Sequence, residues 1–135
     1  MPFTVSDEET RRTIADFLEM GYAENIVAMF RQDENLYDWT GLLLNDDRFM
    51  VRMGLVVVFE ELAKTEGPAK TARAIDALVP LLSRDTPSYV RGEAVTILGL
   101  IGSEEAMGHI RGLLDDPDKQ VREIVTDLLR DSSGG

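Results

Sequence analysis

The sequence of 135 residues contains no cysteine and only one histidine, His109. Without cysteine there are no disulfides, thiolate metal sites or cysteine nucleophiles, and nothing points to an oxidising compartment. A lone histidine in a polar stretch is more typical of a solvated side chain than of a metal ligand or a catalytic base. We therefore expect no metal site, no cofactor and no enzymatic activity.

Long apolar runs and positive charges are also scarce. The longest apolar run, residues 55–59, is far too short to span a bilayer, and the N-terminus lacks the basic start and apolar core of a signal peptide. Asp and Glu number 25 against 14 Lys and Arg, which gives a net charge of −11. This acid excess repels nucleic acids and anionic membranes and favours a basic protein partner. We expect a cytoplasmic protein without nucleic-acid or membrane partners.

No segment alternates apolar and polar residues with a period of two, whereas every long apolar pattern has a helical period. The sequence therefore predicts an all-α fold of about eight helices in four hairpins. The pairs are about 7–20 with 22–32, 34–44 with 48–64, 69–83 with 88–101, and 104–114 with 118–130. We expect one domain over residues 1–131 and a disordered tail at 132–135.

Local signals mark several helix ends. Ser6 followed by Glu9 predicts a capping box, and Gly21 predicts a left-handed terminator. Gly41 interrupts an apolar stripe and is expected to cost about 1 kcal/mol relative to Ala in a helix interior. Pro80 is expected to kink or end its helix because it has no amide hydrogen to donate.

A short frame recurs three times along the chain. An aspartate is followed six residues later by an arginine in a Val-Arg pair, at Asp46 and Arg52, Asp85 and Arg91, and Asp116 and Arg122. Apolar residues also coincide five, nine, twelve and thirteen positions after each aspartate. This spacing places one apolar stripe along the second helix of each hairpin. Repeating helical units of this kind stack into a solenoid. The clear repeats are about 34–64, 69–102 and 103–131, with a degenerate pair at 6–32.

With these residues in view, the chain resembles HEAT-repeat proteins, in particular the short HEAT-like type found in phycobilisome lyases and in small bacterial and archaeal scaffolds. The resemblance is strongest over residues 74–129 and weakest before residue 36. It implies an α-α superhelix in which the inter-helix aspartate and the second-helix arginine form a structural ladder between neighbouring repeats. The ladder residues would be Asp46, Arg52, Asp85, Arg91, Asp116 and Arg122. A guanidinium fork makes paired charge-assisted hydrogen bonds that lysine cannot reproduce.

Enzymes with related folds fit poorly. HEAT-like deoxyhypusine hydroxylases hold two irons with several His-Glu pairs, but this chain has one histidine. HEAT-like alkylpurine DNA glycosylases use Trp, Asp and Arg in a cationic groove. Although Trp39, Asp38 and Arg48 are present, the acid excess opposes DNA binding. The sequence has no bilin-lyase signature beyond the shared repeat. A lyase-type or accessory enzyme subunit acting on a cofactor-bearing protein is the alternative function.

The second helices differ in one row of positions. Phe49, Met53 and Val57 are apolar where the later units are expected to present solvated residues, including Gly92 and Thr96. Either the N-terminal helices cover this row, or it is an exposed groove for a partner with Tyr37 and Trp39 at its rim. We favour a non-enzymatic scaffold that binds another protein through this face, and a homo-oligomer that extends its own stack is a further possibility. The expected partner-binding residues are Trp39, Phe49, Met53, Val57, Glu60, Thr96, Glu123 and Asp127.

Overall fold

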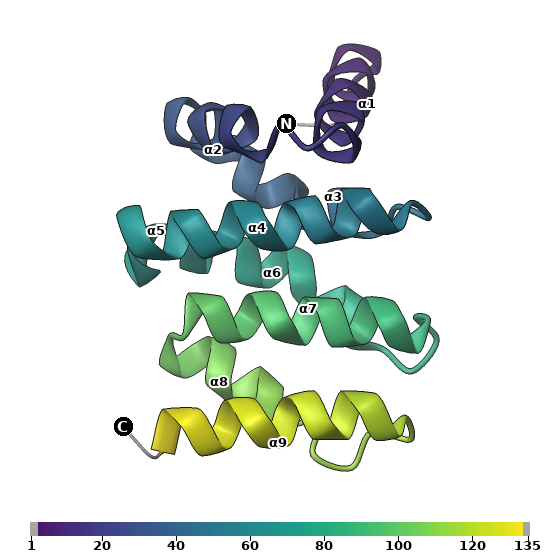
Figure 1. The fold of residues 1–135 in the computed structure, drawn as a ribbon, viewed down its shortest axis with the longest axis vertical. Coiled ribbons are helices and arrows are strands. Elements are labelled where there is room, and N and C mark those ends of the chain that lie inside the picture. Colours follow the sequence, from purple (N-terminus) through teal and green to yellow (C-terminus); the bar gives the residue numbers. More distant parts are fainter. Residues whose placement is uncertain (1–2, 134–135) are drawn as a thin grey trace.

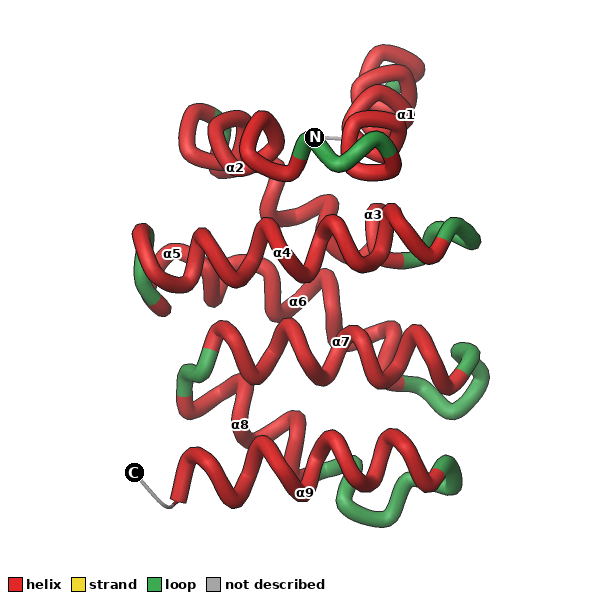
Figure 2. Tube along the Cα trace, viewed as in Figure 1, coloured by secondary structure: helices red, strands yellow, loops and turns green. Residues whose placement is uncertain are grey.

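The computed structural model describes residues 3–133, which form only helices and loops, so the all-α prediction is confirmed. Figure 2 shows the absence of strands over this part of the chain. The α-helices are α1 (Val5–Glu19), α2 (Ala23–Gln32), α3 (Thr40–Leu44), α4 (Phe49–Thr65), α5 (Pro68–Thr71), α6 (Ile75–Leu78), α7 (Ser88–Ile101), α8 (Glu104–Arg111) and α9 (Lys119–Ser133). The 3-10 helices are η1 (Glu34–Trp39), η2 (Ala72–Ala74) and η3 (Val79–Leu82).

The helices stack along one axis, as the predicted superhelix requires. Helices α4, α7 and α9 run side by side across the view in Figure 1, and each packs on the next. The shorter helices α3, α6 and α8, which come first in these hairpins, form a second layer behind them. Helices α1 and α2 are seen nearly end-on at one end of the stack, and both pack on α4. The first hairpin therefore crosses the second helices instead of continuing their direction.

Helix α1 begins two residues earlier than the sequence predicts. The Thr4 hydroxyl accepts from the Asp7 amide at 3.0 Å, and the Asp7 carboxylate accepts from the Thr4 amide at 2.9 Å. The predicted capping box of Ser6 and Glu9 is therefore wrong, because Thr4 and Asp7 offer the same pairing earlier in the chain. Gly21 follows this helix with φ +89°, which confirms the predicted left-handed terminator.

The segment 68–82 is a chain of short helical turns. Pro68 occupies the first turn of α5, and Pro80 lies in η3, directly after α6 ends at Leu78. This confirms the predicted break at Pro80. The first helix of the preceding hairpin is divided in the same way, into η1 and α3.

Gly41 serves a packing role that the sequence did not reveal. A Cβ added at Gly41 in α3 would overlap the backbone carbonyl oxygen of Ala77 in α6. The close approach of these two first helices therefore requires glycine, and this requirement outweighs its unfavourable helix propensity.

The buried stripe of each second helix forms the core, as its repeated apolar positions predict. Val51 and Leu55 of α4, and Val90 and Ala94 of α7, are almost fully buried. In α9, Leu129 is only partly buried, and no described helix lies beyond it. Helix α9 continues through Ser133, so the first part of the predicted tail is helical, and Gly134 and Gly135 lie outside the described residues.

Candidate functional site

Arg91 and Asp116 form the most complete rung between neighbouring units. Arg91 Nε donates to Asp116 Oδ2 and Arg91 Nη2 donates to Asp116 Oδ1, both at 2.9 Å. The two side chains are 5% and 0% exposed. Burial alone would raise the pKa of Asp116, but the hydrogen bonds from Arg91 and from the Asp118 amide hold this pKa below its usual range. Both residues belong to the set that the resemblance assigned to a ladder between neighbouring repeats.

Arg52 makes the preceding rung with a different acid. Its Nε donates to Glu93 Oε2 at 2.7 Å, and its Nη1 donates to the backbone carbonyl of Asp46 at 2.8 Å. Burial raises the pKa of Glu93, and the nearby Arg52 only partly opposes this effect. The Asp46 carboxylate instead accepts from the guanidinium of Arg48, at 3.0 and 3.1 Å.

The predicted rung at Asp85 is wrong. In the other two units the ladder aspartate accepts from the amide two residues later, as Asp46 does from Arg48 and Asp116 from Asp118. Ahead of α7 this turn is made by Ser83, whose hydroxyl accepts from the Asp85 amide at 3.2 Å. The Asp85 side chain is left exposed, and Glu93, within α7, supplies the carboxylate.

The row on α4 is mostly uncovered, so the alternative in which the N-terminal helices bury it is wrong. Phe49 is 58% exposed and Val57 is 49% exposed, whereas Met53 is partly buried. Helix α1 packs on the side of α4 that carries Gly54, where an added Cβ would lie 3.1 Å from the Leu18 Cβ. The N-terminal helices therefore leave the row open to solvent.

Two further residues extend this apolar strip. Met50 of α4 and Tyr89 of α7 are each 53% exposed. The Arg52 guanidinium lies between two aromatic rings, 4.7 Å from the Tyr89 centroid and 5.8 Å from the Phe49 centroid. These cation–π contacts restrain both rings. Tyr89 was missed because it stands one position off the compared row.

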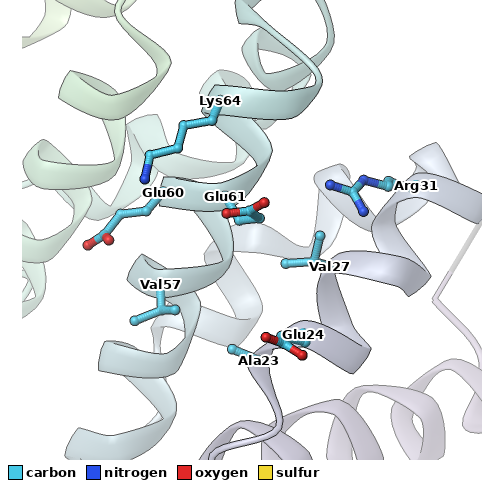
Figure 3. A pocket seen from close by; sticks show the side chains of 8 residues that line it. All are labelled: Ala23, Glu24, Val27, Arg31, Val57, Glu60, Glu61 and Lys64. Carbon is cyan, nitrogen blue, oxygen red and sulfur yellow. The ribbon is translucent and has the colours of Figure 1, made fainter.

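A groove of about 400 Å³ continues the strip between α2 and α4. Val27 and Val57 lie on its two facing helices, as Figure 3 shows. The groove is lined by Ala23, Glu24, Val27, Arg31, Val57, Glu60, Glu61 and Lys64. Arg31 donates to the Thr65 hydroxyl at 2.7 Å and to Glu66 at 3.2 Å. The groove thus combines an apolar floor with three carboxylates and two basic groups.

The aromatic residues expected at the rim do not lie there. Tyr37 is 1% exposed and packs edge-on against Phe30 and Phe59, so the prediction that it anchors a partner is wrong. Its buried hydroxyl has no hydrogen-bond partner within the described chain. Trp39 lies among the first helices, with its ring edge-to-face with Phe3 at 5.4 Å. The structure does not bring Trp39 together with the strip.

The later units contribute less to this face than predicted. Gly92 is buried, because α9 lies close enough that an added Cβ would sit 3.2 Å from Ile124 Cδ1. Its predicted solvation is therefore wrong. Thr96 is partly buried and donates to the Gly92 carbonyl at 2.9 Å. Glu123 and Asp127 are exposed as expected and form ion pairs within α9.

Within residues 3–133, no three His, Asp or Glu side chains are grouped so that they could hold a metal ion. In the same part of the chain, no helix has the length and apolar character needed to cross a bilayer.

The chain was compared with known protein families, curated proteins and solved structures. A family model described as HEAT repeats matches residues 75–132. This segment is similar to HEAT repeats. The matched segment contains α6 to α9 and the Arg91–Asp116 rung, while the Arg52–Glu93 rung links it to the unit before. No curated protein matches the chain, and no solved structure matches it.

Proposed function

We propose that this protein is a non-enzymatic scaffold that binds a partner protein through the second-helix face. HEAT repeats generally mediate protein–protein interaction, which supports the proposal that the partner is a protein. The observation that carries the choice of face is the apolar strip formed by Phe49, Met50, Met53, Val57 and Tyr89, which the N-terminal helices leave open. A contiguous exposed apolar strip commonly marks an interaction site.

The aromatic end of the strip has the properties of an interface anchor. Phe49 and Tyr89 expose large apolar surfaces, and Arg52 holds both rings in place. A ring that is already ordered loses little conformational entropy on binding, and burial of its exposed half contributes about 1 kcal/mol or more. We therefore expect the anchors of binding at this end.

The groove end favours a partner with basic side chains. Glu24, Glu60 and Glu61 surround the apolar floor, while Arg31 is occupied by Thr65 and Glu66. A Lys or Arg side chain could lay its aliphatic stem over Val27 and Val57 and bring its charge to these carboxylates. Charge complementarity of this kind mainly sets specificity and association rate.

Two substitutions test the face. Val57 on α4 and Leu42 on α3 are each 49% exposed, but they lie on different layers of the stack. Partners captured with the wild-type chain would be identified by mass spectrometry, purified and titrated calorimetrically against Val57→Asp and Leu42→Asp. We expect Val57→Asp to weaken binding by about tenfold or more, because it places a charge in a desolvated contact, and Leu42→Asp to leave affinity unchanged.

The reverse pattern would reject the proposal. If a folded Val57→Asp variant binds the purified partner with wild-type affinity while Leu42→Asp does not, the first-helix layer is the binding surface. A partner that is chemically modified by the wild-type chain would contradict the proposal that this protein is not an enzyme.

A further inference from the structure

The three ladder arginines use their nitrogen atoms in one consistent way. In each unit, Nη1 donates to a backbone carbonyl in the loop before its helix: Arg52 to Asp46, Arg91 to Thr86, and Arg122 to Asp116. In the first two units, Nε donates to a carboxylate of the next unit along the stack, Glu93 or Asp116. Nη1 therefore orients the guanidinium, and its Nε edge faces the following unit.

In the third unit, Arg122 makes the backbone hydrogen bond of this pattern but not the hydrogen bond to a carboxylate. Arg122 Nη1 donates to the Asp116 carbonyl at 2.7 Å, and the residue is partly buried. Among residues 3–133, no side chain or carbonyl accepts from Arg122 Nε or Nη2. A guanidinium oriented by one bond loses little further entropy when it binds a carboxylate. The Arg122 edge is thus prepared for an acid that the described chain does not supply.

The surroundings of Arg122 favour an acidic ligand with some apolar surface. An open groove of about 520 Å³ is lined by Leu114, Lys119, Arg122, Glu123, Thr126, Asp127 and Arg130. Three of these residues are cationic and two are anionic, so the lining of this groove carries one net positive charge on a chain of net charge −11. Leu114 is 52% exposed beside them.

The opposite end of the stack has the complementary character. Helices α1 and α2 lie at one end of the long axis and α9 at the other, as Figure 1 shows. Val5, the first residue of α1, is 79% exposed, and Met20, directly after its last residue, is 58% exposed. Glu9 is exposed on the same side of the helix as Val5, one turn further along, and it has no ion-pair partner within the described residues. Asp16 is already paired with Arg48 at 2.9 Å.

We propose that two copies of this chain associate head to tail, with Glu9 of one copy completing the rung at Arg122 of the next. The site is incomplete without the second copy, because the Nε edge of Arg122 has no acceptor among residues 3–133. The exposed apolar residues Val5 and Met20 would lie against Leu114. Such a contact joins two different surfaces, so association is open-ended and depends on concentration. It uses the ends of the stack and is independent of the proposed second-helix binding face.

Sedimentation velocity from micromolar to millimolar protein tests this contact. We expect the weight-average sedimentation coefficient of the wild type to rise with concentration. Glu9→Gln and Arg122→Gln should each weaken association by about fivefold, the usual effect of losing one partly exposed ion pair. Glu9→Gln changes an exposed side chain, so it tests the contact even if Arg122→Gln destabilises the loop before α9.

Charge reversal gives the sharpest outcome. Glu9→Arg and Arg122→Glu should each suppress association, and the double variant Glu9→Arg/Arg122→Glu should restore it. Asp76→Asn and Lys70→Gln remove the same charges from exposed residues away from both ends and should leave association unchanged. A wild type that stays monomeric at all concentrations overturns the proposal. A double variant as defective as the single variants, or controls that weaken association equally, also overturns it.

Discussion

Replacement of Arg91 by Met is the most informative perturbation of the stack. It removes two hydrogen bonds of 2.9 Å from the Asp116 carboxylate, whose side chain is 0% exposed, and leaves this charge only the amide of Asp118. Removal of one partner from a buried ion pair typically costs about 3–5 kcal/mol. Domains of this size have unfolding free energies of about 5–15 kcal/mol, so we expect Arg91→Met to remove a large share of the total stability.

Urea unfolding followed by far-UV circular dichroism measures this loss. Asp116→Asn should also destabilise the protein, and the double variant should cost less than Arg91→Met alone, since it also removes the buried charge that Arg91→Met leaves without its partner. Arg73→Met is the matched control, because Arg73 pairs with Asp38 through side chains that are 40% and 54% exposed. Such a pair contributes less than about 1 kcal/mol. If Arg91→Met costs no more than Arg73→Met, the rung does not hold the units together.

Three further predictions concern single sites. Gly41→Ala should destabilise the protein by about 1–3 kcal/mol in thermal unfolding, because the added methyl group meets the Ala77 carbonyl; an unchanged or raised Tm would show that α3 and α6 separate freely. Tyr37→Phe should stabilise by about 1 kcal/mol in urea unfolding, since it removes a buried hydroxyl without a partner, whereas a loss of stability would show that this hydroxyl is hydrogen-bonded. The pKa of Asp116 is lowered in the folded protein, so the contribution of its carboxylate to stability is present above the ordinary value of 3.8 and is lost as the pH falls through the folded pKa. The difference in unfolding free energy between wild type and Asp116→Asn should therefore shrink in acid, and a difference that widens would contradict this sign.

The repeat frame predicted much of the architecture because its signals are local. Apolar spacing located the second helices, and the resemblance supported by the recurring Val-Arg pair placed Arg91 in a ladder between neighbouring repeats, where it contacts Asp116. Breaks at Gly21 and Pro80 also followed from the backbone chemistry of these residues. Such features depend on neighbours within one or two turns, which a single sequence contains.

Features that depend on the angle between helices were not accessible in this way. Glu93 replaced Asp85 in the ladder because Ser83 took over the turn ahead of α7. The exposure of Phe49 depends on how α1 and α2 cross α4, and the need for glycine at Gly41 depends on how closely α3 approaches α6. These relations join residues that no local pattern connects.

The binding face can be read directly from methionine methyl groups in NMR spectra of the complex. The chain has six methionines, of which Met50 and Met53 lie on the second-helix face and Met29 and Met107 lie on α2 and α8. With selectively labelled protein and a purified partner, we predict that the Met50 and Met53 signals shift or broaden while the Met107 signal stays in place. A spectrum in which Met107 responds and Met50 and Met53 do not would contradict binding through this face.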